Sequence, residues 1–261
     1  FALSLLMFLG VVTRNRALAP WFALAQLRWS PQAVRDVWRL GLPIAGTYAS
    51  EAGFFSVLTL LIGTLGMEAL AAQTVLNQII YIVFMVSAGL SHAASIHVSE
   101  ACGVADFARA RRLGVISLVL GAAAMLMVAV PYVVVPELIV ALFISAEHSR
   151  HTATLALAAS GLLIAALMQL FDASQNIGNG VLRGTGDTAG PFRISLIGYW
   201  LVGLPCAYVL GSVGGYGVYG VWVGQTIGLA ATALMLMLSF NTRLHGLAAQ
   251  VGTVPPAVQA R

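Results

Sequence analysis

The chain has 261 residues, of which 59% are hydrophobic and 8% are charged, and its formal net charge is +4. Soluble globular proteins carry about 25% charged residues, so this composition excludes an ordinary water-soluble domain. The mean hydropathy of +0.91 and the 27 glycines are typical of a multi-span membrane protein, in which small residues let helices approach closely. The lipid bilayer is therefore the first expected partner, and no nucleic-acid partner is expected.

Residues 1–12 are apolar but too short to cross a bilayer, which takes about 20 helical residues. We expect them to be the end of a span that begins before Phe1, so that the sequence is a piece of a longer protein. Residues 13–40 form a polar connection. Within it, Ser30 is suited to cap a helix and Pro31 to occupy its first turn, which predicts a short amphipathic helix on the membrane surface.

Six long apolar segments follow this connection. Each is predicted to be a helix, because a backbone in lipid must satisfy its own hydrogen bonds. The expected fold is an all-α lobe of six transmembrane helices over residues 41–240, followed by a C-terminal tail over 241–261. The predicted spans are 41–65, 72–98, 113–135, 152–182, 191–212 and 217–240.

All 13 basic residues are arginines, and their placement predicts the orientation of the spans. Twelve lie in the first connection, in alternate connections after it, or beyond the sixth span. Only Arg150 lies in a connection of the opposite side. Basic loops stay in the cytoplasm, so we expect a cytoplasmic C-terminus.

Two carboxylates interrupt the apolar spans, Glu51 in the first and Asp172 in the fourth. Each lies about 16 Å from the cytoplasmic end of its span at 1.5 Å per residue, which is near the centre of the bilayer. A carboxylate there costs at least about 2.5–3.5 kcal/mol, so we predict that both acids face a polar interior. Because burial favours the neutral acid and bound Na⁺ favours the charged one, the pair is predicted to take up Na⁺ or H⁺. Hard oxygen ligands do not suit a transition metal, and no resident cofactor is expected.

Polar side chains accompany the acids on the same helical faces. On the fourth span the residues recur every three or four positions, and on the second every four, which predicts that both stripes line a common cavity. Tyr48 and Phe55 share the face of Glu51 and are predicted to line it too. The predicted lining residues are Tyr48, Phe55, Gln73, Asn77, Tyr81, Met168, Gln169, Asn176 and Asn179. Further aromatic and methionine candidates are Phe54, Phe84, Met85 and Phe171.

Each of these predictions has an alternative. The amides could instead form hydrogen bonds between helices, and the aromatic and methionine side chains could simply pack. Arg183 and Asp187 fall in a tight turn and could form an ion pair. His92 and His97, toward the cytoplasmic end of the second span, could sense pH or make an ordinary polar contact.

Five segments, in order along the chain, resemble the seventh to twelfth spans of the multidrug and toxic-compound extrusion (MATE) transporters, and in particular the NorM-type bacterial branch. They are "LGLPIAG" at 40–46 with Glu51 after it, "CGVADFARARRLG" at 102–114, "FDASQNIGNGVLRGTGDT" at 171–188, "GYWLVGLPCAYVL" at 198–210 and "GVYGVWVGQTIG" at 217–228. The resemblance implies the C-terminal lobe of a twelve-helix transporter in the bacterial inner membrane, with a six-helix N-terminal half as its missing partner.

The resemblance also implies a function. Family members export organic cations and other amphipathic compounds in antiport with Na⁺ or H⁺, and in the NorM-type branch the carboxylates matching Glu51 and Asp172 are associated with the coupling cation. Some members carry a tyrosine one turn before the second acid, where this chain has Met168. Amphipathic cationic small molecules are therefore the expected cargo, and the chain is not expected to be an enzyme.

Two other functions, an intramembrane protease and a lipid flippase, are alternatives. "GTGD" at 184–187 matches a motif of intramembrane aspartyl proteases, but Asp172 and Asp187 would lie about 22 Å apart along a continuous helix and could not share a water. A flippase for lipid-linked oligosaccharides of related architecture tends to keep basic residues within its spans to bind anionic lipids. No arginine here lies in the middle of a span, which favours a cation-exchanging exporter.

Overall fold

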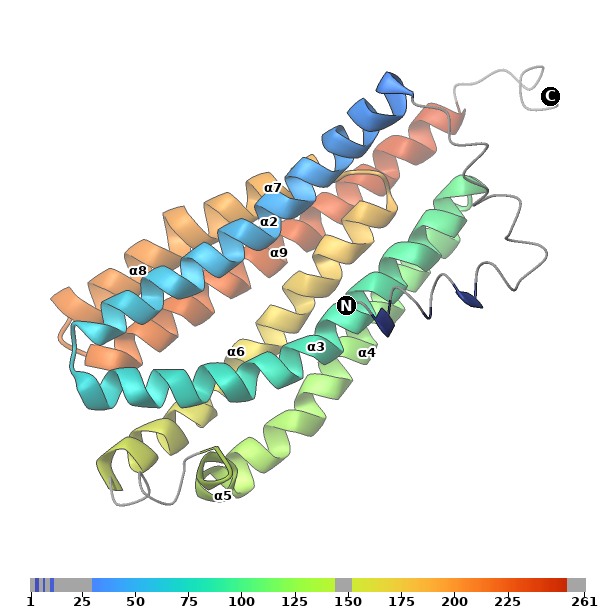
Figure 1. Ribbon diagram of the computed structural model, residues 1–261. Coiled ribbons are helices and arrows are strands. Elements are labelled where there is room, and N and C mark those ends of the chain that lie inside the picture. Colours follow the sequence, from blue (N-terminus) through green and yellow to red (C-terminus); the bar gives the residue numbers. More distant parts are fainter. Residues whose placement is uncertain (1–2, 5–6, 8–9, 12–29, 144–151, 253–261) are drawn as a thin grey trace. The chain divides into compact units, whose positions relative to one another are not determined.

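The computed structural model describes residues 3–4, 7, 10–11, 30–143 and 152–252 (Figure 1). It contains two units, residues 1–41 and 42–261. The described part is built from helices and short turns, without a strand, and six of its helical segments are long and apolar enough to cross a membrane. The predicted all-α fold with six spans is confirmed.

Five spans are single helices, and the remaining span is composite. The single helices are α2 (Pro31–Gly63), α3 (Met67–Gly103), α4 (Phe107–Val134), α6 (Thr152–Gly184) and α9 (Gly217–Gly252). The composite span consists of α7 (Ala189–Leu196), the π-helix η3 (Ile197–Gly203), α8 (Leu204–Tyr208) and the π-helix η4 (Val209–Val213). A six-residue helix, α5 (Pro136–Ala141), follows α4.

Several helices extend beyond the predicted spans. Ser30 Oγ accepts the Ala33 N–H at 3.3 Å, as a helix cap does, but the helix that starts there continues unbroken to Gly63. The predicted surface helix and the first span therefore form one continuous helix across residue 41. At the other end α9 runs to Gly252, well past 240. The apolar pattern marks the part of a helix that matches lipid, whereas the helix itself ends where its hydrogen bonds stop. The predicted tail at 1–12, most of the connection at 13–40, and Arg150 lie largely outside the described residues.

The composite span was predicted as one regular helix at 191–212, and the structure differs. The Leu204 N–H bonds to the Tyr199 carbonyl and the Gly214 N–H to the Val209 carbonyl, five residues back in each case. Pro205 supplies a local reason for the first π-helix, because proline lacks an N–H and its ring crowds the carbonyl four residues before it. A wider turn before Pro205 relieves that crowding.

The buried apolar side chains form two clusters, and α6 contributes to both. One cluster includes Phe54, Leu76, Leu162, Tyr199 and Trp222, and the other includes Val98, Ile177, Val181, Leu236 and Phe240. α6 thus crosses the whole core, which places its polar side chains between the other spans.

Glycines bring two pairs of spans into backbone contact. On α9, a Cβ at Gly220, Gly224 or Gly228 would collide with the backbone of the composite span. On α6, a Cβ at Gly180 or Gly184 would collide with backbone carbonyls of α3. Contacts between small residues hold membrane helices together. These contacts therefore pair α9 with the composite span and α6, which carries Asp172, with α3.

Candidate functional site

The two intramembrane acids lie in one cavity of about 400 Å³ between α2, α3 and α6. Only 7% of Glu51 and 4% of Asp172 is exposed. The cavity is lined by Tyr48, Glu51, Ala52, Phe55, Asn77, Ile80, Tyr81, Phe84 and Asp172. The structure therefore brings together the two carboxylates that the sequence placed at matching depth.

Helical spacing explains how two of the walls form. The α2 residues of the cavity are spaced three or four apart around Glu51, and the α3 residues follow the same spacing from Asn77, so each set lies on one helical face. Tyr81 and Phe84 stack with their ring centroids 6.1 Å apart. Five predicted residues are found here: Tyr48, Phe55, Asn77, Tyr81 and, from the further candidates, Phe84. Ala52 and Ile80 were missed because small and aliphatic residues give no polar signal, although the spacing itself includes them.

The acid on α6 has an oxygen without a protein partner. Asp172 Oδ1 is buried and accepts no hydrogen bond among the described residues, and the same holds for Gln169 Oε1, Gln175 Oε1 and Asn179 Oδ1. Buried acceptors normally have a donor. A row of acceptors on one helix, without matching donors, suits a bound proton, cation or water. No group of three or more His, Cys, Asp or Glu side chains that could hold a metal ion occurs within the described ranges, so a cation here would depend on this pair and on neutral oxygens.

Five predicted lining residues lie outside this cavity: Gln73, Met168, Gln169, Asn176 and Asn179. Three of them make the interhelical hydrogen bonds of the alternative prediction. Gln73 Oε1 accepts the Trp222 Nε1–H at 2.6 Å. Gln169 Nε2 donates to the Tyr132 hydroxyl and Asn176 Nδ2 to Ser87 Oγ, both at 3.3 Å. The polar stripe of α6 covers a wider arc than one cavity, so its members face different neighbours.

The other two residues, Met168 and Asn179, line small neighbouring cavities. Met168 Sδ accepts a hydrogen bond from Gln225 Nε2 at 3.1 Å, in a cavity of about 10 Å³ between α3, α6 and α9. Asn179 lines a second cavity of that size near the end of α6, together with Asn176 and Arg183. Tyr48 lines both this second cavity and the acidic one.

Arg183, at the end of α6, connects three helices. Its Nη1 donates to the Tyr48 hydroxyl of α2 at 3.3 Å and its Nη2 to Ser91 Oγ of α3 at 3.0 Å. Ser91 Oγ in turn donates to the Asn176 carbonyl at 2.6 Å. The predicted ion pair with Asp187 is wrong, because Asp187 Oδ1 instead accepts the Gly190 N–H at 2.8 Å and closes the turn.

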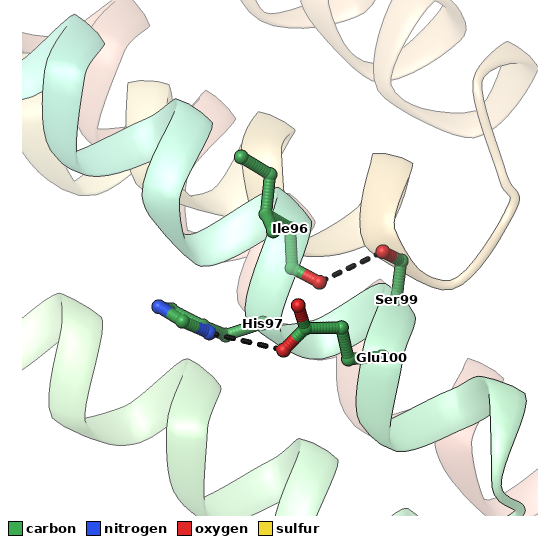
Figure 2. Close-up of polar contacts among 4 residues, drawn as sticks. All are labelled: Ile96, His97, Ser99 and Glu100. Atoms are coloured by element: carbon green, nitrogen blue, oxygen red, sulfur yellow. Dashed lines mark hydrogen bonds and ion pairs between the residues drawn. The ribbon is translucent and has the colours of Figure 1, made fainter. Parts of the chain in front are cut away.

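The histidines of α3 lie outside the acidic cavity. His97 Nδ1 lies 3.2 Å from Glu100 Oε2, one turn along the same helix. Figure 2 shows this contact beside the bond from Ser99 Oγ to the Ile96 carbonyl. Both side chains of the His97–Glu100 contact are about 60% exposed. The predicted ordinary polar contact is confirmed for His97, and His92 is exposed as well.

Comparison with known proteins identifies the family to which this lobe belongs. The MatE family profile matches residues 43–209, a stretch that contains both acids and the whole acidic cavity. The chain belongs to the MatE family. The resemblance seen in the sequence is thereby confirmed.

Curated relatives of this MatE chain are named as resistance proteins. It is 42% identical over 208 residues to a probable multidrug resistance protein NorM of Pseudomonas aeruginosa, covering 80% of this chain and 43% of that one. It is also 42% identical over 210 residues to the protein of that name from Deinococcus radiodurans, covering 80% and 47%. The chain thus spans about half the length of these relatives.

Solved structures share the fold. A crystal structure of MATE in the bent conformation superposes with a TM-score of 0.78 at 18% identity, over 88% of this chain and 50% of that one. A eukaryotic MATE transporter gives 0.74 at 22% identity, over 94% and 55%. The MatE chain is a multi-pass membrane protein of a transporter family. Consistent with this, Asp172 lies within the continuous helix α6 and Asp187 beyond its end, so the two cannot form a protease dyad.

Proposed function

We propose that this MatE chain forms the cation-coupled half of a secondary transporter that exports amphipathic organic cations in exchange for Na⁺ or H⁺. Glu51 and Asp172 are the coupling-cation site. The observation that carries this proposal is the meeting of two buried carboxylates, from α2 and α6, in one cavity with aromatic walls. Two such acids are costly in a membrane unless a proton or a cation compensates them.

The cavity suits a competition between cations. One Na⁺ or proton shared by the two acids would remove much of their repulsion, and an organic cation entering the same space would do so in its place. Alternate occupancy by the two kinds of cation gives exchange, provided that each favours a different state of the transporter.

The walls suit an amphipathic cargo. About 400 Å³ lies within the usual range of small-molecule pockets. Four aromatic rings line the cavity, those of Tyr48, Phe55, Tyr81 and Phe84. Aromatic rings attract organic cations through their electron-rich faces. The lining contains two acids and no arginine, which favours cationic cargo over the anionic lipid of a flippase.

The names of the relatives and the distribution of arginines support a drug exporter in a bacterial membrane. Two relatives that are 42% identical to this chain are named for multidrug resistance. The arginine-rich connections favour a cytoplasmic C-terminus in a bacterial inner membrane. We infer that the working transporter pairs this lobe with a further six-helix half.

The test is the variant Asp172→Asn in the complete gene product. We expect cation-driven efflux of ethidium from cells to fall to the level of cells without the transporter, while membrane insertion is retained. The matched control is Asp187→Asn, which keeps the oxygen that accepts the Gly190 N–H and is expected to transport normally. Efflux against a gradient by the Asp172 variant would refute the coupling role.

A further inference from the structure

Two adjacent aromatic residues of the π-helix η3, Tyr199 and Trp200, reach both of the helices that carry the acids. Neither lines the acidic cavity, and neither is used in the exchange described above. Their contacts fall within three residues of Glu51 on α2 and of Asp172 on α6.

The contacts with α2 lie on either side of Glu51. Trp200 Nε1 donates to Ser50 Oγ at 3.0 Å. The Tyr199 ring stacks on the ring of Phe54, with the centroids 5.0 Å apart and the planes at 8°. The indole of Trp200 also covers Gly53, where an added Cβ would lie 3.4 Å from Cζ2. The segment that carries Glu51 thus makes three contacts with η3, at positions one to three residues from the acid.

The contact with α6 lies one turn from Asp172. Gln175 Nε2 donates to the Tyr199 hydroxyl, and both side chains are fully buried. Gln175 Oε1 has no hydrogen-bond donor within the described part of the chain, so the bond to Tyr199 is what anchors this amide. Tyr199 therefore contacts α2 through its ring and α6 through its hydroxyl.

The π-helix explains how neighbours in the sequence can do this together. A wider turn reduces the angle between consecutive side chains, so Tyr199 and Trp200 diverge less than they would in an α-helix. The glycines of η3 lie close to α9: a Cβ at Gly198 would collide with Thr232, and a Cβ at Gly228 of α9 would collide with Gly203. The backbone of η3 is thus packed against α9, while its two aromatic side chains contact the helices that carry the acids.

We propose that Tyr199 and Trp200 are positioning residues that set the separation of Glu51 and Asp172, and thereby the affinity of the pair for the coupling cation. The proposal rests on the proposed function, since it requires that the pair binds a cation. Fixing two ligands at the right separation before binding removes the cost of ordering them afterwards. Weakening either contact is therefore expected to lower cation affinity more than the maximal rate of transport.

The test uses Tyr199→Phe, which removes the hydroxyl and keeps the stack, and Trp200→Phe, which removes the donor to Ser50. Ser50→Ala removes the same bond from the α2 side without changing an aromatic ring. The complete gene product is reconstituted in proteoliposomes, and ethidium transport is measured while Na⁺ and pH are varied separately. For each variant we expect the cation concentration for half-maximal transport to rise about 3- to 10-fold, as for the loss of one hydrogen bond, with the maximal rate within about twofold of wild type.

Tyr219→Phe is the matched control. It also removes a tyrosine hydroxyl that contacts α6, but the partner is Ser160 Oγ at 2.8 Å, which lies 12 residues before Asp172. We expect it to leave the half-maximal cation concentration unchanged. In the double variant Ser50→Ala with Trp200→Phe, the shift should be no larger than in either single variant.

The positioning role is overturned if the three variants keep the wild-type half-maximal concentration, or if Tyr219→Phe shifts it equally. Either result leaves the proposed function standing as long as Asp172→Asn is inactive. Transport by Asp172→Asn would instead remove the proposed function itself, and the positioning role with it.

Discussion

The interface of α9 with the composite span and the interface of α2 with the rest of the lobe are built in opposite ways. Along α9, Gly220, Gly224 and Gly228 allow backbone to lie against backbone. Along α2, two of the four glycines face aromatic rings: a Cβ at Gly46 would meet Phe192 and one at Gly53 would meet Trp200. One interface is a direct backbone contact, and the other is mediated by long side chains.

The difference indicates which part of the lobe can move. Backbone contacts cannot shift without losing their fit, because protein interiors are closely packed. Aromatic and arginine side chains can follow a displaced helix by changing rotamer. Glu51 lies on α2, whereas Asp172 lies on α6, which packs through Gly180 and Gly184 against α3. We therefore expect α2 to be the helix that responds to cation binding, with α3, α6, α9 and the composite span as its frame.

The largest effect is expected from one methyl group added where backbone lies against backbone. Gly224→Ala places a Cβ in collision with the backbone of Cys206 and Ala207. We expect a loss of stability of about 1–3 kcal/mol, the usual cost of overpacking, seen as a lower melting temperature of the purified protein in detergent. The control is Gly89→Ala on α3, where nothing lies within 4 Å of the added Cβ, and it should not lower the melting temperature. Equal destabilisation by both variants would contradict the idea of a backbone-fitted frame.

A smaller effect is expected where α2 is held by side chains at the end of α6. Arg183→Gln removes the donors to Tyr48 and Ser91, and we expect a loss of about 1 kcal/mol, typical of a polar contact between membrane helices. Tyr48→Phe should cost less and should add little in the double variant, because both changes break the same bond. Arg193→Gln, at an exposed arginine of α7, is the control. Fully additive losses would show that Arg183 does not act through Tyr48.

The smallest effect is predicted for a methyl group on α2 itself. Gly53→Ala meets the Trp200 ring at 3.4 Å, an ordinary contact, and alanine favours a helix over glycine by about 0.8–1.0 kcal/mol. We expect an unchanged or slightly higher melting temperature, measured beside Gly224→Ala. A loss as large as that of Gly224→Ala would show that α2 packs as tightly as the frame.

The sequence predicted the fold well because lipid imposes simple rules. Long apolar segments had to be helices, and six of them were found. The break in the composite span was missed, since hydropathy is blind to hydrogen-bond register. Pro205, with Gly198 and Gly203 before it, was the available signal.

The site was predicted in part for a related reason. Glu51 and Asp172 stood out because charge is costly in lipid, and their matching depth allowed them to meet. Depth does not determine which way an amide turns, so Gln73 and Gln169 were placed in the cavity although they bond between helices. Tyr199 and Trp200 gave no signal at all, because their role depends on the wider turn of η3.

Counting the cations bound by the purified protein shows whether Glu51 and Asp172 form one cation site. The purified complete protein would be examined by equilibrium dialysis with radioactive Na⁺ and by proton uptake in weakly buffered solution. We predict that Glu51→Gln, Asp172→Asn and the double variant each bind one coupling cation fewer than wild type. If either single variant keeps the wild-type number at wild-type affinity, or if the double variant loses two, the carboxylates do not share a cation.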